Sequence, residues 1–240
     1  MNKTIVVVTF NIGNGLAPTE RLRDFLRSVS ADIVGLQEVS PQQATVLGED
    51  ISDLYPHRIV SGTGFSGRAL LSRFPITDHA WITCHPGRPD LRARVSIDEQ
   101  EMTVVVAHPS PPKPGRNGIV FDSITLQQIR DTANLTVESR PAVLLGDFNM
   151  TIRNPAYQWM TEIGLTDAYV NVGNRGGRTF PVRLSRIWRM KVPISWMPLR
   201  PVARLDYIWL TSEISPLEAW LGEDVGSDHL PVLARLSLSN

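Results

Sequence analysis

Two polar side chains stand directly after an apolar run in the middle of the chain. Residues 142–146 read AVLLG, and Asp147 and Asn149 follow, separated by Phe148. The run is typical of a strand that is buried on both faces. Asp and Asn are common turn residues, and their oxygens can also hold a metal ion or a phosphate. At positions i and i+2 of an extended backbone the two side chains point to the same side, so both are expected to reach one reacting group.

Polar residues of similar types stand at the ends of other apolar runs or within them. They are Asn11, Glu38, His108, Asp206, Asp228 and His229. Any one of them alone is typical of a turn or a solvated loop. Their recurrence along one chain predicts that they gather in a single site.

The residue types indicate phosphate chemistry with a hard divalent cation. Mg²⁺ and Mn²⁺ prefer oxygen ligands and bind through one or two carboxylates, which Glu38 and one further acidic residue can supply. Cys84 is the one cysteine of the chain, so neither a cysteine-rich zinc site nor an internal disulfide is indicated. Two histidines and two amides suit the binding of phosphate oxygens.

Short apolar strands are the elements that must position these residues. In the last of them, which ends at Leu238, apolar residues alternate with Arg235, Ser237 and Ser239, which predicts a sheet with one wetter face. The segment 109–115 is rich in proline and is expected to be a stiff loop. The expected strands are 4–10, 32–37, 68–72, 102–107, 142–146, 205–210 and 231–238.

Helical periodicity lies between the strands. Leu22, Phe25, Leu26 and Val29 share one helical face behind Thr19, which is the expected N-cap. Two further helices are expected, one over 124–137 opened by Ser123 and one that begins at Pro155 after Asn154.

The bulk composition is that of an ordinary globular protein. The chain has 240 residues, of which 42% are hydrophobic and 20% charged, and its formal net charge is zero. No run is long enough to cross a membrane, and the N-terminus lacks a signal-peptide cleavage pattern. We therefore expect one α/β domain over residues 1–240, with sheets packed together and helices outside, in the cytoplasm.

Six segments resemble the endonuclease/exonuclease/phosphatase superfamily, which includes deoxyribonucleases, exonuclease III-type endonucleases, neutral sphingomyelinases and inositol polyphosphate 5-phosphatases. In chain order they are TFNIGNG, LQEVS, GRALLSRFPI, LLGDFNM, RLDYIWL and GSDHLPV. The resemblance runs from about residue 4 to 238, and GDFN followed about eighty residues later by SDH is its most specific pair. It implies a four-layer α/β sandwich, with two mixed β-sheets face to face, helices outside, and an active site at one edge.

The resemblance also implies which residues bind the metal ion, Mg²⁺ or Mn²⁺. Glu38 matches the principal metal carboxylate of the superfamily. Asn11 matches the residue beside it that helps to hold metal and phosphate, and Asp228 matches a second carboxylate on the metal side.

The remaining matched residues have catalytic roles in the superfamily. His229 matches the catalytic imidazole, and Asp206 the buried carboxylate that fixes its tautomer, as in a serine-protease triad. Asp147 matches the residue that positions or deprotonates the attacking water, and Asn149 the amide that holds the phosphate oxygens. His108 matches the second histidine of the deoxyribonuclease and sphingomyelinase branches. Either Asp147 or His229 could take the proton of the water.

Charge is uneven along the chain and bears on the substrate. Residues 168–205 contain eight Lys and Arg, Arg178 among them, and no Asp or Glu. This pattern indicates either a surface that binds a polyanion or an exposed basic loop with no binding function. In the same segment Trp188 and Trp196 could stack on unpaired bases or enter a lipid interface. Arg68 could reach a phosphate or be solvated.

Three functions follow from these observations. The favoured one is a metal-dependent nuclease that cleaves DNA by in-line attack of water. The second is a phospholipid, lipid-pyrophosphate or small-molecule phosphoesterase, because the segments VVVAHPSPP and GRTFP resemble a bacterial subgroup of membrane-linked lipid-pyrophosphate phosphatases. The third is a non-catalytic polyanion-binding module, which the complete set of polar positions argues against.

Overall fold

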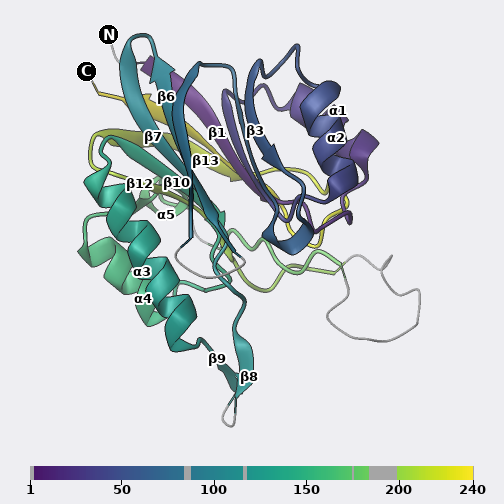
Figure 1. The fold of residues 1–240 in the computed structure, drawn as a ribbon. Helices are drawn as coiled ribbons and strands as arrows, with labels where there is room; N and C mark the ends of the chain where they lie inside the picture. Colours follow the sequence, from purple (N-terminus) through teal and green to yellow (C-terminus); the bar gives the residue numbers. More distant parts are fainter. Residues whose placement is uncertain (1–2, 84–87, 116–117, 175, 184–198, 240) are drawn as a thin grey trace.

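The computed structural model of the protein describes all residues except 1–2, 84–87, 116–117, 175, 184–198 and 240 (Figure 1). In chain order its elements are β1 (Lys3–Asn11), α1 (Thr19–Ser28), β2 (Ile33–Gln37), α2 (Pro41–Glu49), β3 (His57–Ser61), the 3₁₀ turn η1 (Gly64–Ser66), β4 (Arg68–Ser72), β5 (Ile76–Ile82), β6 (Asp90–Ile97), β7 (Gln100–Ala107), β8 (Lys113–Gly115), β9 (Gly118–Val120), α3 (Ser123–Glu138), β10 (Ala142–Asp147), α4 (Pro155–Glu162), β11 (Thr166–Asp167), α5 (Ala168–Asn171), β12 (Asp206–Leu210), β13 (Ile214–Leu221) and β14 (Val232–Leu238).

Two six-stranded mixed sheets pack face to face, with helices on the outside, as expected from the sequence (Figure 1). The first sheet has the order β13-β14-β1-β2-β4-β3, and the second has the order β11-β12-β10-β7-β6-β5. The pairs β1–β2 and β7–β10 are parallel, and the other neighbours are antiparallel.

Both faces of the central strands are covered, which explains their continuous apolar sequences. In β1, Ile5 and Val7 belong to the core between the sheets, whereas Val8 and Phe10 pack beneath α1 and α2. Successive side chains of a strand point to opposite faces, so a strand covered on both sides needs apolar residues at every position. The second sheet is covered in the same way by α3 and α4.

The two sheets approach closely at Gly35 of β2. A Cβ atom built on this glycine would lie 2.9 Å from Leu145 Cδ1 and 3.1 Å from a methyl carbon of Val106. Both of these side chains belong to the second sheet. A larger residue at position 35 would therefore push the sheets apart two residues from the end of β2.

Several local predictions need correction. Thr19 and Ser123 are the first residues of their helices, since Pro18 and Asp122 occupy the N-cap positions. The Asp122 carboxylate accepts a hydrogen bond from the Thr125 amide. In β14 only Arg235 is exposed, so the expected wetter face is confined to that residue.

Several elements were not expected, among them a hairpin and a helix near the site. The proline-rich loop contains β8, which pairs with β9 in a hairpin that projects from one end of the sandwich (Figure 1). Helix α2 was missed although its start carries a capping box, in which Ser40 and Gln43 each bond the backbone amide of the other. Asn154, by contrast, caps α4 as predicted.

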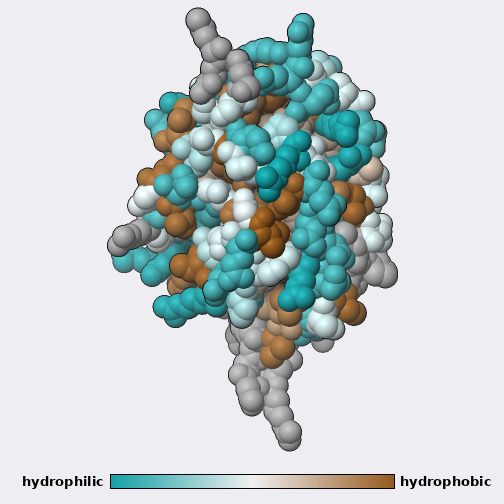
Figure 2. Space-filling view, turned by 90° about the vertical axis from the view of Figure 1, so that its left-hand side faces the viewer, coloured by the Kyte–Doolittle hydropathy of each residue, from teal (hydrophilic) through white to brown (hydrophobic). Residues whose placement is uncertain are grey.

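The surface on the side of α3 and α4 is mixed. Figure 2 shows hydrophilic residues interspersed with apolar ones on this face. In the described part of the chain no helix is both long and apolar enough to cross a bilayer.

Candidate active site

The predicted polar residues come together at one edge of the sandwich. Strands β1, β2, β7 and β10 end at this edge, and β12 and β14 begin there, because β12 and β14 run antiparallel to their neighbours. The edge lies at the end from which the β8–β9 hairpin projects, opposite the chain termini (Figure 1).

Asn11 and Asp147 join the two sheets across this edge. The Asn11 Nδ2 atom donates a hydrogen bond of 2.9 Å to Asp147 Oδ2, and Asn11 Oδ1 accepts one of 3.0 Å from the Gly13 amide. Both Asn11 and Asp147 are buried. The bond therefore fixes the amide and the carboxylate in one orientation, with residues of both sheets in a single site.

The chain turns sharply after Asp147. Asn149 has a left-handed backbone with φ of +53°, its amide donates to Asp147 Oδ1 at 2.9 Å, and its Nδ2 donates to the Pro109 carbonyl at 3.1 Å. The extended backbone that we expected from Asp147 to Asn149 is therefore wrong. Asp147 acts as a turn residue through one oxygen and as a site residue through the other.

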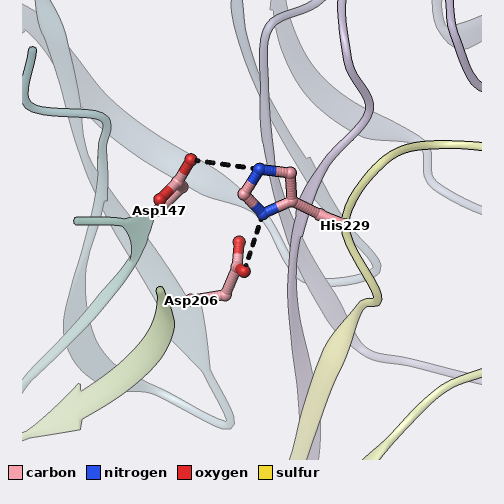
Figure 3. A group of neighbouring side chains, drawn as sticks. All are labelled: Asp147, Asp206 and His229. Atoms are coloured by element: carbon pink, nitrogen blue, oxygen red, sulfur yellow. Dashed lines mark hydrogen bonds and ion pairs between the residues drawn. The ribbon is translucent and has the colours of Figure 1, made fainter. Parts of the chain in front are cut away.

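His229 bridges two carboxylates (Figure 3). Its Nδ1 donates to Asp206 Oδ2 at 2.9 Å, and its Nε2 lies 3.7 Å from Asp147 Oδ2. Burial alone would lower the pKa of His229, but the Asp206 and Asp147 carboxylates outweigh burial and raise this pKa to about 10. In the absence of a metal ion the imidazole is therefore a cation at neutral pH.

Two neighbours fix the position of His229. Ser227 Oγ accepts a hydrogen bond from the His229 amide at 3.2 Å and donates one to the Asn11 carbonyl at 2.7 Å. The Phe180 ring packs against the imidazole, with 4.7 Å between the ring centroids.

His108 reaches the same carboxylate from the other side. Its Nε2 lies 3.5 Å from Asp147 Oδ2 and 3.7 Å from Glu38 Oε1. Burial, followed by the positive charges of Arg68 and Arg88, lowers the pKa of His108 well below its usual value. This imidazole is neutral at neutral pH and can donate one hydrogen bond.

A buried ion pair holds the backbone of His108. The Asp90 carboxylate accepts from the His108 amide at 3.1 Å, and Arg68 Nη2 donates to the His108 carbonyl at 3.2 Å. Arg68 and Asp90 are both fully buried and lie 3.9 Å apart, and Thr132 donates to the other Asp90 oxygen.

Arg68 therefore differs from its sequence-based interpretation. It is not solvated, and its buried guanidinium is not open to a substrate. Asp90 was missed altogether, because it stands among charged residues in the segment RPDLRAR, which is typical of an exposed strand.

Glu38 offers a carboxylate for a divalent cation. Burial, then the negative charge of Asp147 and also that of Asp228, raises the pKa of Glu38 to about 7. A cluster of carboxylates of this kind fits a bound cation, which would neutralise it. Asn11 bonds Glu38, and the charge of Asp228 acts on it, so these three residues stay the predicted ligands of the cation.

A second acidic group fits a cation less well. Asp147, Asp206 and His229 offer ligand atoms within 4.8 Å of one another (Figure 3). The hydrogen bond between His229 Nδ1 and Asp206 already occupies this group, so it is better described as an imidazole held between two carboxylates.

The basic segment is divided between structural and exposed residues. Arg204 pairs with Asp167, and Arg183 pairs with Asp224. Arg178 is exposed. Trp188 and Trp196, the predicted stacking residues, lie outside the described residues.

The sequence matches a known family over most of its length. The match to the Endonuclease/Exonuclease/phosphatase family covers residues 8–229. The chain belongs to this family. It is therefore a phosphoesterase of that superfamily.

Similar proteins extend the comparison. The uncharacterized protein YbhP of Escherichia coli (strain K12) is 26% identical over 97% of this chain and 96% of its own length. The fold is similar to D. rerio TDP2 complexed with a single-strand DNA product, with a TM-score of 0.74, 18% identity, and coverage of 98% of this chain and 99% of that one. It is also similar to the 3′ phosphatase NExo from Neisseria bound to a product DNA hairpin, with a TM-score of 0.72, 18% identity, and coverage of 96% and 98%.

Proposed function

We propose that this protein is a divalent-metal-dependent phosphodiester hydrolase that cleaves DNA by in-line attack of an activated water. The observation that carries the proposal is the position of the Asp147 carboxylate between two imidazoles, within 3.7 Å of each. The DNA products bound by TDP2 and NExo, which share the fold, support DNA as the substrate class.

Asp147 is the better candidate for the general base. In the metal-free protein His229 has a pKa of about 10 and so carries its proton at neutral pH, whereas burial raises the pKa of Asp147 above its usual value. A carboxylate with a raised pKa is a better proton acceptor. Asp147 would take the proton of the attacking water.

His229 and His108 would then stabilise the charge that develops on phosphorus oxygens. His229 presents a charged N–H donor, neutral His108 presents a second donor, and the Asn149 amide supports the same oxygens. Asp206 keeps His229 protonated and oriented. Mg²⁺ or Mn²⁺ held by Glu38, Asn11 and Asp228 would neutralise the phosphate and the leaving oxygen.

One substrate panel tests the proposal. The protein is incubated with supercoiled plasmid, single-stranded DNA, bis(4-nitrophenyl) phosphate, and liposomes that contain sphingomyelin or a prenyl pyrophosphate. Each substrate is tested with Mg²⁺, with Mn²⁺ and with EDTA, and the Asp147→Ala variant serves as the control for contaminating nucleases. We expect DNA cleavage that needs the metal and that the variant lacks. Hydrolysis of the liposome substrates with intact DNA would overturn the proposal in favour of a lipid phosphoesterase, and inertness on every substrate would favour a binding module.

A further inference from the structure

A pocket of about 630 Å³ is lined by segments that lead to the candidate active site. Its volume falls within the range of about 300–1,000 Å³ that is usual for small-molecule sites. Three segments of the chain line it, namely 151–153, 176–178 and 202–204, together with residues of α5. None of these lining residues belongs to the catalytic group described above.

Each of the three segments runs directly to a site residue. Thr151 stands two residues after Asn149, Arg178 two residues before Phe180, and Ala203 three residues before Asp206. Because an extended residue spans at most about 3.6 Å, each wall begins within roughly 10 Å of a residue that contacts the reacting group or His229. The walls of the pocket therefore begin close to the residues around which the scissile phosphate is proposed to bind.

Apolar side chains form part of the walls. Ile152, Val170 and Val202 are 55%, 47% and 69% exposed. Tyr169 also lines the pocket, and Gly177 packs against its ring so closely that a Cβ atom there would overlap it. An aromatic or aliphatic group bound in the pocket would remove these apolar surfaces from water.

Two arginines give the pocket a positive charge. Arg153 and Arg178 are exposed and have no hydrogen-bond or ion-pair partner among the described residues, and no acidic residue lines the pocket. Arg204 also lines it, but Asp167 neutralises it through contacts at 2.6 and 3.1 Å. The two unpaired arginines come from different walls, so they would attract an anionic group in addition to the phosphate in the catalytic site.

We propose that this pocket binds the nucleotide adjoining the scissile phosphate, with the next phosphate on Arg153 and Arg178 and the sugar and base against Ile152, Val202 and Tyr169. The inference rests on the proposed function. A nucleic acid strand carries a phosphate on both sides of each nucleotide. A phosphodiester lipid has its phosphate at the scissile position, where the catalytic residues hold it, and leaves nothing for the arginines to bind.

Kinetics on two substrates test the pocket. The double variant Arg153→Gln/Arg178→Gln is compared with the wild type and with Arg23→Gln, a partly exposed arginine on α1 that pairs with Asp24. A single-stranded oligonucleotide contains the additional phosphates, whereas bis(4-nitrophenyl) phosphate has one phosphate only. We expect the KM for the oligonucleotide to rise about tenfold in the double variant, and the salt dependence of log(kcat/KM) to lose a slope of about 1.4 for two phosphate contacts. Hydrolysis of bis(4-nitrophenyl) phosphate should change less than twofold, and Arg23→Gln should match the wild type on both substrates.

The possible results separate the two proposals. An unchanged KM and salt slope in a double variant that still cleaves DNA would overturn the pocket and leave the proposed function standing. A wild-type protein that hydrolyses bis(4-nitrophenyl) phosphate but no nucleic acid would overturn both. Impaired hydrolysis of a prenyl pyrophosphate, with unaltered cleavage of DNA, would assign the arginines to the second phosphate of a lipid pyrophosphate.

Discussion

His108 and His229 approach the same Asp147 oxygen from two sides, yet His108 is neutral and His229 is a cation in the metal-free protein. Both are buried. Burial, followed by the positive charges of Arg68 and Arg88, lowers the pKa of His108, although the Asp147 and Glu38 carboxylates lie within 3.7 Å of its Nε2. Around His229 the nearby charges are carboxylates, which raise its pKa in spite of burial. Burial acts on both histidines, and the two are separated by the hydrogen-bonded Asp206 carboxylate beside His229 and the arginines beside His108.

The largest effect on the rate is expected when His229, the cationic imidazole, or its neighbour Asp147 is removed. His229→Ala and Asp147→Ala should each lower kcat on a metal-loaded phosphodiester substrate by about 10²–10⁴-fold, as for other acid–base groups. Because the two residues act as a unit, the double variant should lose little more than either single one. A rate near that of the wild type in either variant would remove that residue from the mechanism.

The position of His108, the neutral imidazole, depends on the buried ion pair between Arg68 and Asp90. Asp90→Asn keeps the shape of the side chain but leaves Arg68 as a buried charge without its partner, which should lower the free energy of unfolding by about 3 kcal/mol. Urea denaturation measures this change. Asp98→Asn is the matched control, because its ion pair with Lys3 is exposed and should be worth less than about 1 kcal/mol. Equal losses of unfolding free energy in the two variants would contradict a buried, structurally important pair between Arg68 and Asp90.

Asp206→Asn should bring the pKa of His229 closer to that of His108. Removal of this carboxylate should lower the NMR titration midpoint of His229 in the metal-free protein from about 10 towards 6.5, and the rate by about tenfold. Because the pKa of His229 is raised by folding, its stabilising contribution is complete below pH 6.5 and is lost as the pH rises towards 10. The free energy of unfolding should therefore fall less steeply over this range in the variant. An unshifted midpoint would show that Asp206 does not control the charge of His229.

The smallest effect is expected at Phe180, whose ring packs on the charged imidazole. Phe180→Leu should lose a contact worth about 0.5–1 kcal/mol, which corresponds to a two- to fivefold loss in kcat/KM. The His229 midpoint should fall slightly, since the ring favours the cation. A midpoint that rises instead would mean that the ring acts only by excluding water.

The sequence predicted the layers and the gathering of polar residues because both follow from local patterns. The apolar run of β10 indicated a strand covered on two faces, and the residues that follow it indicated the site edge. The turn at Asn149 and the start of α2 were also encoded locally. They were missed because an extended continuation after Asp147 was assumed and because the pairing of Ser40 with Gln43 was not recognised.

The parts that could not be predicted depend on contacts between distant residues. Asp90 holds His108 from 18 positions away along the chain, and nothing near Asp90 in the sequence distinguishes it from a solvated acid. Arg204 and Arg183 look like members of a basic surface until Asp167 and Asp224 are seen beside them. Sequence separation conceals such pairs, so the charge that a segment presents to solvent was overestimated.

The left-handed backbone of Glu38 and Asn149 has a consequence for how the protein could be altered. Each has a positive φ, +57° for Glu38 and +53° for Asn149, a conformation that glycine adopts more readily than either residue. Replacement of either residue by glycine would relieve local strain while deleting a group that the proposed reaction uses. Selection for thermal stability alone would therefore favour glycine at these two positions at the expense of activity. A screen for more stable variants of this protein should measure catalysis in the same step.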